Sequence, residues 1–140
     1  MKALLDTGVW WRWMTHGPID VRLKSFLENE VTEFHLCPIS LTEVFYKIKN
    51  NKEKAPELPD WETLILEGFR LAPVSFAAAR LAGEWPWAHG DPMDRILAAV
   101  AATENLTLIH TDRVLKELSG FPQRYFKSVQ MPKIPGQSSA

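Results

Sequence analysis

Short apolar runs alternate along the chain with longer segments in which apolar residues recur every three or four positions. The short runs are typical of buried strands, and the longer segments are typical of amphipathic helices. Strands are expected over residues 3–5, 34–37, 71–74 and 106–109, with a fifth, edge strand over 126–131. Helices are expected over residues 20–31, 40–48, 61–69, 75–84, 91–102 and 112–118. This alternation predicts an α/β fold with a mostly parallel sheet and right-handed crossovers.

The length and composition indicate one ordinary globular domain. Of the 140 residues, 46% are hydrophobic and 24% are charged, which excludes a largely disordered chain. We expect the domain to span residues 1–131 and the tail, 132–140, to be disordered. No apolar run is long enough to span a membrane, and Asp6 interrupts the apolar start, so a cytoplasmic protein without a signal peptide is expected. The single cysteine, Cys37, excludes an intrachain disulfide.

Asp94 does not fit the helix that is expected to begin after Asp91. Asp91 and Pro92 are residue types that favour the start of a helix. Asp94 precedes Leu97 and Ala98 by three and four residues, so it lies on the helix face that should point at the core. A carboxylate aimed inward is costly unless a positive group meets it, and a metal ion is one such group. Alternatively, Asp94 closes a turn with Asp91 that is similar to a capping box.

Four acidic residues are placed where a parallel sheet gathers its ligands, at the carboxyl ends of the strands. Asp6 follows the first expected strand directly, and Asp112 follows the fourth by three residues. Glu43 lies in the first turn of the helix after the second strand, and Asp94 lies in the first turn of the helix before the fourth. Without a cation these carboxylates would repel one another in a partly dry cleft. Oxygen ligands of this kind suit Mg²⁺ or Mn²⁺.

Two of these acids also have structural explanations. Glu43 is spaced to close a capping box with Ser40 and lies one turn before Lys47, so it would stabilise a helix without any further function. Asp112 is suited to cap the helix that follows it. Asp6 ends an apolar strand and has no local cap to make, which favours a functional role.

Three sequence motifs together resemble the PIN domain, and more narrowly the VapC toxins, which are the ribonucleases of toxin–antitoxin pairs. The motifs are Leu4-Leu5-Asp6-Thr7, Ser40-Leu41-Thr42-Glu43 and the block from His89 to Ala99, and the likeness extends to about Met131. The resemblance implies a three-layer α/β/α sandwich, a metal-dependent endoribonuclease, a VapB-like antitoxin as partner and a homodimer. The family's acidic quartet falls on Asp6, Glu43, Asp94 and Asp112.

Two residues depart from the pattern of the family. Met93 stands where the family usually has Phe, which is a tolerable apolar exchange. His110 stands where the family commonly has Ser or Thr. An imidazole at this position could hydrogen-bond one of the acids, ligate the ion or cover the end of the sheet.

Metal-assisted hydrolysis of a phosphodiester is the reaction that the carboxylates and a hard ion favour, and no Ser-His-Asp or Cys-His arrangement is recognisable. Asp6 and Asp94 are expected to be direct ligands of the ion. Glu43 and Asp112 are expected to hold a second ion or to orient the attacking water. The hydroxyl of Thr7 is a further candidate for the ligand shell.

Binding of RNA would need local positive charge, because the net charge of −1 gives no general attraction to nucleic acid. Arg12 and Arg95 flank the acidic elements and are candidates for binding phosphates. Arg95 is also placed to pair with Asp91, one turn earlier. The lysines at positions 47, 49, 52 and 54 form a basic stretch that would either contact phosphates or remain a solvated helix end.

Five of the six tryptophans fall in two clusters, at residues 10–13 and 85–87. This density favours an apolar groove for a partner helix or stacking of unpaired bases, although packing around the sheet would explain several of them. Two other classes of function stay open. One is a PIN-like module that binds RNA or a protein without cleavage. The other is a phosphoacceptor receiver domain, whose usual lysine after the last strand has no clear counterpart here.

Overall fold

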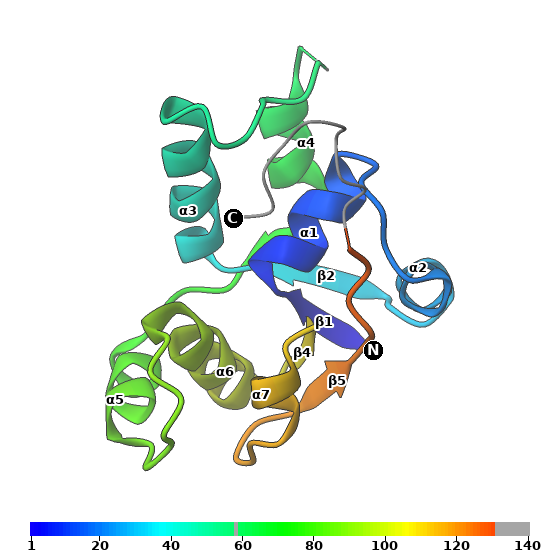
Figure 1. The fold of residues 1–140 in the computed structure, drawn as a ribbon. Helices are drawn as coiled ribbons and strands as arrows, with labels where there is room; N and C mark the ends of the chain where they lie inside the picture. The colour runs from blue at the N-terminus through cyan, green and yellow to red at the C-terminus, as the bar shows by residue number, and fades with distance from the viewer. Residues whose placement is uncertain (58, 131–140) are drawn as a thin grey trace.

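The computed structural model describes residues 1–57 and 59–130. The chain folds around a parallel sheet with the strand order β3-β2-β1-β4-β5 (Figure 1). The strands are β1 (Lys2–Leu5), β2 (Glu33–Leu36), β3 (Arg70–Leu71), β4 (Thr107–His110) and β5 (Gln123–Tyr125). The helices are α1 (Thr7–Met14), α2 (Val21–Asn29), α3 (Pro38–Lys49), α4 (Trp61–Gly68), α5 (Phe76–Glu84), α6 (Pro92–Glu104) and α7 (Arg113–Lys116). The predicted α/β class with a parallel sheet is confirmed.

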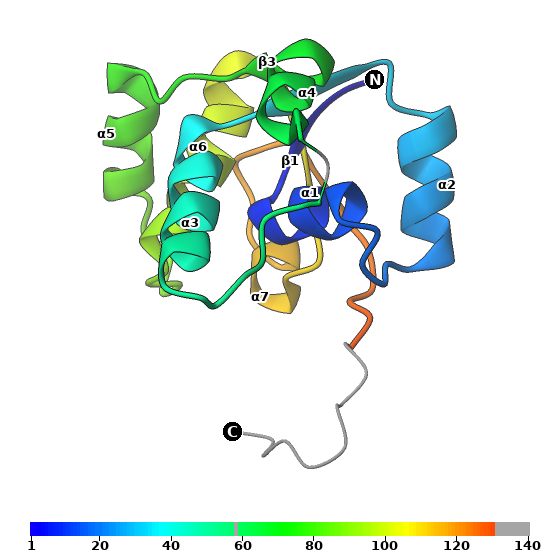
Figure 2. The same cartoon turned by 90° about the horizontal axis from the view of Figure 1, so that it is seen from above.

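Helices cover both faces of the sheet. Along β1, Ala3 and Leu5 belong to one buried cluster and Leu4 to another, because successive side chains of a strand point to opposite faces. The first cluster includes residues of α1 and α2, and the second includes residues of α5 and α6. Figures 1 and 2 show α1 and α2 on one side of the sheet and α5 and α6 on the other. The fold is therefore the three-layer α/β/α sandwich that the resemblance implies.

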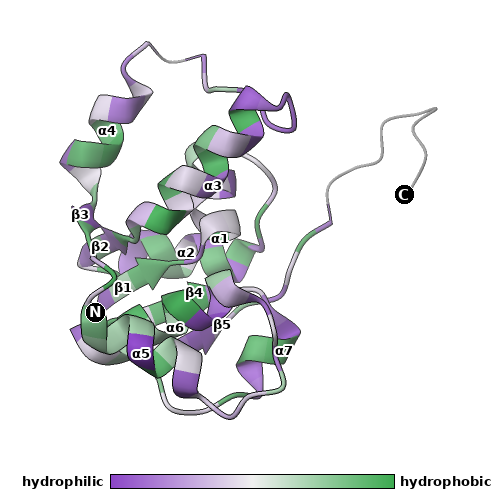
Figure 3. Ribbon diagram, turned by 90° about the vertical axis from the view of Figure 1, so that its left-hand side faces the viewer, coloured by the Kyte–Doolittle hydropathy of each residue, from purple (hydrophilic) through white to green (hydrophobic). Residues whose placement is uncertain are grey.

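Helix α6 packs against the centre of the sheet and begins as the sequence indicates. Asp91 is its N-cap and accepts a hydrogen bond from the N–H of Met93 (2.9 Å), and Pro92 is its first residue. The segment from Leu97 to Ala101 is buried, and its alanines allow a close approach to α5. Asn105 ends the helix in the left-handed conformation (φ 54°), which asparagine tolerates better than most residues. Figure 3 shows both hydrophobic and hydrophilic residues on the helices around the sheet.

Several elements differ from those expected. Helix α1 was not predicted, and the edge strand β5 lies at Gln123–Tyr125 instead of 126–131. Strand β3 is only two residues long. Residues 131–140, which include the expected disordered tail, lie outside the described part of the chain. Within the described residues, no helix is both long enough and apolar enough to cross a membrane.

Candidate metal centre

Asp6 lies where β1 ends and α1 begins. Its backbone N–H donates to the carbonyl oxygen of Ile109 (3.0 Å), which holds this strand end against β4. Although Asp6 occupies the N-cap position of α1, its side chain makes no capping hydrogen bond. Its Oδ2 lies instead beside Gly8, 3.5 Å from where a Cβ on that residue would be. The carboxylate therefore lies close to the N–H groups that begin α1 without making a capping hydrogen bond.

Asp94 points inward from the first turn of α6. Leu97 and Ala98, on the same helix face, are buried, and the side chain of Asp94 is only 15% exposed. Its Oδ2 lies 2.8 Å from Nε2 of His89. Asp91 alone caps the helix, so the alternative of a capping-box-like turn is not what the structure shows.

Glu43 does not close a capping box, because the structure overturns the predicted start of its helix. Helix α3 begins at Pro38, with Cys37 at the N-cap position, so Ser40 lies inside the first turn. Ser40 is fully buried, and its hydroxyl is hydrogen-bonded to the hydroxyl of Thr7 (2.7 Å). Proline fits the first position of a helix because its missing N–H costs nothing there. The only structural partner found for Glu43 in the described residues is Lys47, at 3.4 Å.

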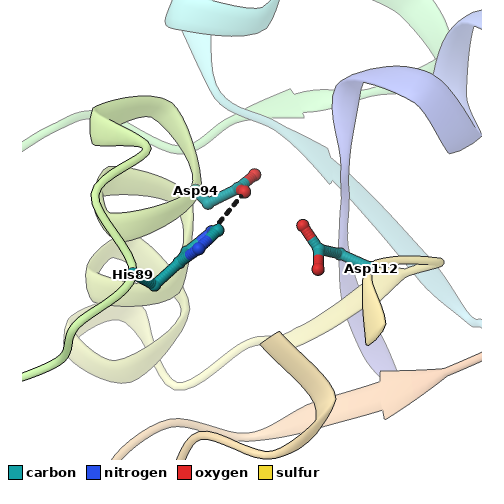
Figure 4. A group of neighbouring side chains, drawn as sticks. All are labelled: His89, Asp94 and Asp112. Atoms are coloured by element: carbon teal, nitrogen blue, oxygen red, sulfur yellow. Dashed lines mark hydrogen bonds and ion pairs between the residues drawn. The ribbon is translucent and has the colours of Figure 1, made fainter. Parts of the chain in front are cut away.

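Asp112 caps the helix that follows it, which is the structural role that the sequence suggests. Its Oδ1 accepts hydrogen bonds from the N–H groups of Val114 (2.7 Å) and Leu115 (3.2 Å), so it caps α7. It also lies next to Asp94. One possible ligand atom from each of His89, Asp94 and Asp112 lies within 4.8 Å of the others, and Figure 4 shows the three side chains around one space.

A cavity of about 340 Å³ joins three of the four acids. Asp6, Glu43 and Asp94 line it, from the end of β1, from α3 and from α6. Asp112 is not among its lining residues and adjoins Asp94 through the group with His89. Asp94 is therefore the residue that connects the cavity with Asp112, and all four predicted acids meet around it.

Burial and mutual repulsion shift the pKa values of these carboxyls. Burial raises the pKa of Asp6 to about 7, and the charges of Asp94 and Glu43 add to the rise, while N–H groups of α1 oppose it. Burial also raises the pKa of Asp94 to about 6, against the hydrogen bond from His89 and with further repulsion from Asp112. Burial opposes the shift of Asp112, but its two backbone hydrogen bonds hold its pKa below the usual range. The charged forms of the two inner carboxyls are therefore poorly stabilised by the protein alone, and both groups take up protons more readily than free aspartates.

The donor set fits a hard divalent cation. Within residues 1–57 and 59–130, no lysine or arginine nitrogen lies within 4.0 Å of the carboxylates of Asp6 or Asp94. Carboxylate oxygens are the ligands that Mg²⁺ and Mn²⁺ prefer. Asp6 and Asp94 could hold such an ion, with Glu43 lining the same cavity and Asp112 grouped with Asp94 and His89.

The guanidinium groups of both candidate phosphate-binding arginines, Arg12 and Arg95, donate hydrogen bonds to backbone carbonyl oxygens of the fold. Arg12 lines the cavity, and its guanidinium also donates to the carbonyl oxygens of Pro18 and Val129. The guanidinium of Arg95 donates to one carbonyl oxygen of α5, that of Ala82, and to three in the loop between α5 and α6, those of Trp85, Trp87 and His89. It thus ties down the loop before α6, and the proposed pairing of Arg95 with Asp91 is not found.

His110 is fully buried and makes hydrogen bonds with both ring nitrogens. Its Nδ1 accepts from the N–H of Asp112 (3.1 Å), so Nε2 carries the hydrogen and donates to Oε1 of Gln123 (2.7 Å). The amide of Gln123 is itself fixed by a bond to the carbonyl oxygen of Leu118 (2.7 Å). Burial lowers the pKa of His110, so it stays neutral. The imidazole covers the sheet end and holds the turn that presents Asp112.

The tryptophans are mostly packing residues. Trp10 is fully buried and Trp11 is 7% exposed, and both belong to the core beside α1. Trp85 and Trp87 are stacked with their ring centroids 4.0 Å apart, and both pack against Phe121. Packing therefore accounts for Trp10 and Trp11, whereas Trp85 and Trp87 are half-buried and Trp87 also lines a hollow beside α5 and α6.

Sequence reasoning does not single out His89 as a site residue. It lies in a loop, where no helical or strand period indicates the direction of a side chain. The only signal in the sequence is its spacing of five residues before Asp94 inside the block that resembles the PIN family.

Replacing Arg95 by methionine is expected to lower the free energy of unfolding by about 3 kcal/mol, because several partly buried carbonyl oxygens lose a charged donor. Urea denaturation measures the change. Arg80→Met is the matched control, since Arg80 is exposed on α5 and pairs only with Glu84, one turn away, and it should change the value by less than ~0.5 kcal/mol. Equal losses in the two variants would contradict the structural role of Arg95.

Comparisons with known proteins agree with this architecture. Among solved structures, the chain is similar to VapBC2 from Rickettsia felis bound to a promoter DNA fragment, with 19% identity over 91% of this chain and 100% of that one and a TM-score of 0.69. It is also similar to a toxin–antitoxin complex from Klebsiella pneumoniae, with 18% identity, coverage of 90% and 99%, and a TM-score of 0.64. DNA-bound VapBC from Salmonella typhimurium gives 19% identity, coverage of 89% and 98%, and a TM-score of 0.61.

At these identities the solved structures establish the shared fold alone. A search among curated proteins finds no significant match. The family model of the PIN domain, by contrast, matches residues 3–120, a range that contains all four acids. This match excludes the alternative of a receiver domain. The chain with its acidic cluster at the ends of β1 and β4 therefore belongs to the PIN domain family.

Proposed function

We propose that this protein is a metal-dependent endoribonuclease that hydrolyses RNA phosphodiesters at the cluster of Asp6, Glu43, Asp94 and Asp112. The observation that carries the proposal is the convergence of these four carboxylates from four separate elements around Asp94. Membership of the PIN domain family supports a nuclease. A purely structural protein would gain nothing from inner carboxyls whose pKa values are raised to about 7 and about 6 by burial and repulsion.

Asp6 and Asp94 are the residues that would hold a Mg²⁺ or Mn²⁺ ion, because they are the most buried acids without a lysine or arginine partner. When bound, such an ion lowers the pKa of a coordinated water and neutralises charge on the phosphate oxygens. Glu43 lines the cavity with a side chain that is 33% exposed, so it can accept a proton from an attacking water that solvent replenishes. Asp112 keeps one oxygen on the backbone of α7 and offers the other beside Asp94.

The substrate would enter from the side of the cavity that Arg12 and Lys47 line. Both are cations at the mouth of an acidic site, where they can hold phosphates flanking the scissile bond. Thr7 is a weaker candidate than the sequence suggests, because its hydroxyl already bonds to Ser40. Arg95 is committed to the loop before α6, so it does not enter this proposal.

We also propose that the protein acts as the toxin of a toxin–antitoxin pair, with a VapB-like antitoxin as its protein partner and a homodimer as its assembly. The support is the likeness in fold to VapBC complexes, which extends over about nine-tenths of this chain and nearly all of the matched chains. The buried tryptophans Trp10 and Trp11 do not form the partner groove that their density suggests, so the binding surface would use other residues.

Incubation of the purified protein with total RNA tests the activity, in parallel samples with Mg²⁺, with Mn²⁺ and with EDTA, followed by mapping of the new RNA ends. Cleavage at discrete positions with either ion, and none with EDTA, is expected. Single-stranded DNA of matched sequence serves as the control substrate. RNA that is bound but left intact under all three conditions would instead support the PIN-like module that binds without cleavage.

A further inference from the structure

We propose that His89 supplies a nitrogen ligand to the cation held by Asp94 and Asp112, so that the site prefers first-row transition-metal ions such as Mn²⁺ over Mg²⁺. This inference rests on the proposed metal-dependent function and names the class of ion that the site takes. It adds to the four predicted acids a residue that comes from a loop.

The position of His89 is the first support. Its Nε2 lies 2.8 Å from Oδ2 of Asp94, and one possible ligand atom from each of His89, Asp94 and Asp112 lies within 4.8 Å of the others. In an octahedral shell, neighbouring ligand atoms are about 3 Å apart and opposite ones about 4 Å. Figure 4 shows the imidazole and both carboxylates directed toward one space. The three groups therefore need only small shifts to share one ion.

The loop that carries His89 is fixed in place, unlike that of an ordinary surface histidine. Arg95, on the next turn of α6 from Asp91, donates to the carbonyl oxygen of His89 itself (3.1 Å) and to three others nearby. Trp85 and Trp87, in the same loop, stack on each other and pack against Phe121. The side chain of His89 is only 16% exposed. A preorganised imidazole of this kind loses little freedom when it binds an ion.

The chemistry of the donor set gives the preference. Mg²⁺ binds oxygen and water ligands and gives up its water reluctantly, so it gains little from an imidazole. Transition-metal ions accept nitrogen ligands more readily. A site made only of Asp6, Glu43, Asp94 and Asp112 would not distinguish the two classes in this way. A simpler role, in which His89 only donates a hydrogen bond that orients Asp94, would affect the binding of both ions alike.

The test compares Mn²⁺ and Mg²⁺ affinities of the full chain, measured by calorimetric titration, for the unaltered protein and for His89→Asn. Mn²⁺ affinity should fall by at least ~10-fold and Mg²⁺ affinity by no more than ~2-fold. His16→Asn is the matched control, because His16 is exposed and its left-handed backbone (φ 56°) is one that asparagine tolerates. Pulsed electron paramagnetic resonance of bound Mn²⁺ should show nitrogen coupling in the unaltered protein and in His16→Asn, but not in His89→Asn.

Equal weakening of both ions, or no nitrogen coupling in the unaltered protein, would overturn the ligand role of His89. Asp94→Asn separates this failure from failure of the metal site. If Asp94→Asn loses Mn²⁺ binding while His89→Asn keeps it, only the nitrogen ligand is wrong. If neither the unaltered protein nor any variant binds Mn²⁺ or Mg²⁺, the metal site and the proposed function fail together. Melting temperatures in EDTA establish that each variant is folded.

Discussion

Asp94→Asn should abolish metal-dependent RNA cleavage, with a loss of more than ~100-fold, whereas Asp91→Asn should cleave at nearly the rate of the unaltered protein. The two residues lie three positions apart at the start of the same helix, and the substitution is the same. Both residues line the cavity, but Asp94 is mostly buried and lies beside Asp112, while Asp91 is exposed and caps α6 through the N–H of Met93. The difference in activity between the two variants thus separates the effect of losing the inward carboxylate from the effect of altering the helix start. End-mapped cleavage of total RNA measures both.

Asp6→Asn should behave like Asp94→Asn, because Asp6 is the second acid that is expected to bind the ion directly. Asp91→Asn serves also as the control for stability, and it should cost ~1 kcal/mol or less, since asparagine is itself a good N-cap residue. An Asp94→Asn protein as active as the unaltered one would mean that the inward carboxylate is not a ligand, and the assignment of the metal centre would be wrong.

In EDTA, Asp6→Asn should become progressively more stable than the unaltered protein as the pH rises from about 4 to about 7. The pKa of Asp6 is raised to about 7 in the folded protein, mainly by burial, whereas an unfolded aspartate titrates near 4. Between these values the folded state binds more protons than the unfolded state, so raising the pH removes stability that protonated Asp6 contributes. Asparagine carries no charge that must be buried, so the free energy of unfolding of the variant does not fall in this way as the pH rises. The expected difference is several degrees of melting temperature at neutral pH.

Added Mn²⁺ should reverse the order of the two proteins. The ion binds the folded arrangement of carboxylates, so it should raise the melting temperature of the unaltered protein in a concentration-dependent way, and it should raise that of Asp6→Asn much less. Calorimetric scans at three pH values, each with EDTA and with Mn²⁺, provide the measurement. A variant that is less stable than the unaltered protein at pH 7 in EDTA, and that still responds fully to Mn²⁺, would show that Asp6 is a structural residue.

The sequence was sufficient to predict where the acids meet, because parallel strands bring their carboxyl ends to one edge of a sheet. Asp6 and Asp112 follow strands that clear apolar runs predict. The inward direction of the Asp94 side chain follows from its helical spacing to Leu97. The same reasoning failed for Ser40, which was expected to cap a helix. The proline at position 38 is equally suited to end a strand and to begin a helix, and only the buried contact between Ser40 and Thr7 decides between them.

The roles of residues that act through tertiary contacts could not be predicted from the periodicity of the sequence. Helix α1 was missed because Val9, Trp10 and Trp11 are successive and all buried, so the segment lacks the alternation of apolar and polar positions that marks a surface helix. Arg95 has a charged residue at helical spacing, Asp91, yet its guanidinium donates to carbonyl oxygens of α5 and of the loop before α6 instead. His89 takes its position from that loop, and a loop carries no periodic signal.

The pairing of β1 with β4 joins segments that lie far apart in the sequence, with Leu5 beside Ile109 in the sheet. Within the domain Asp6 is therefore synthesised well before Asp94 and Asp112, which complete the acidic cluster. An incomplete chain therefore has no complete acidic cluster. A cation that needs ligands from all of these elements therefore cannot bind while the domain is still incomplete.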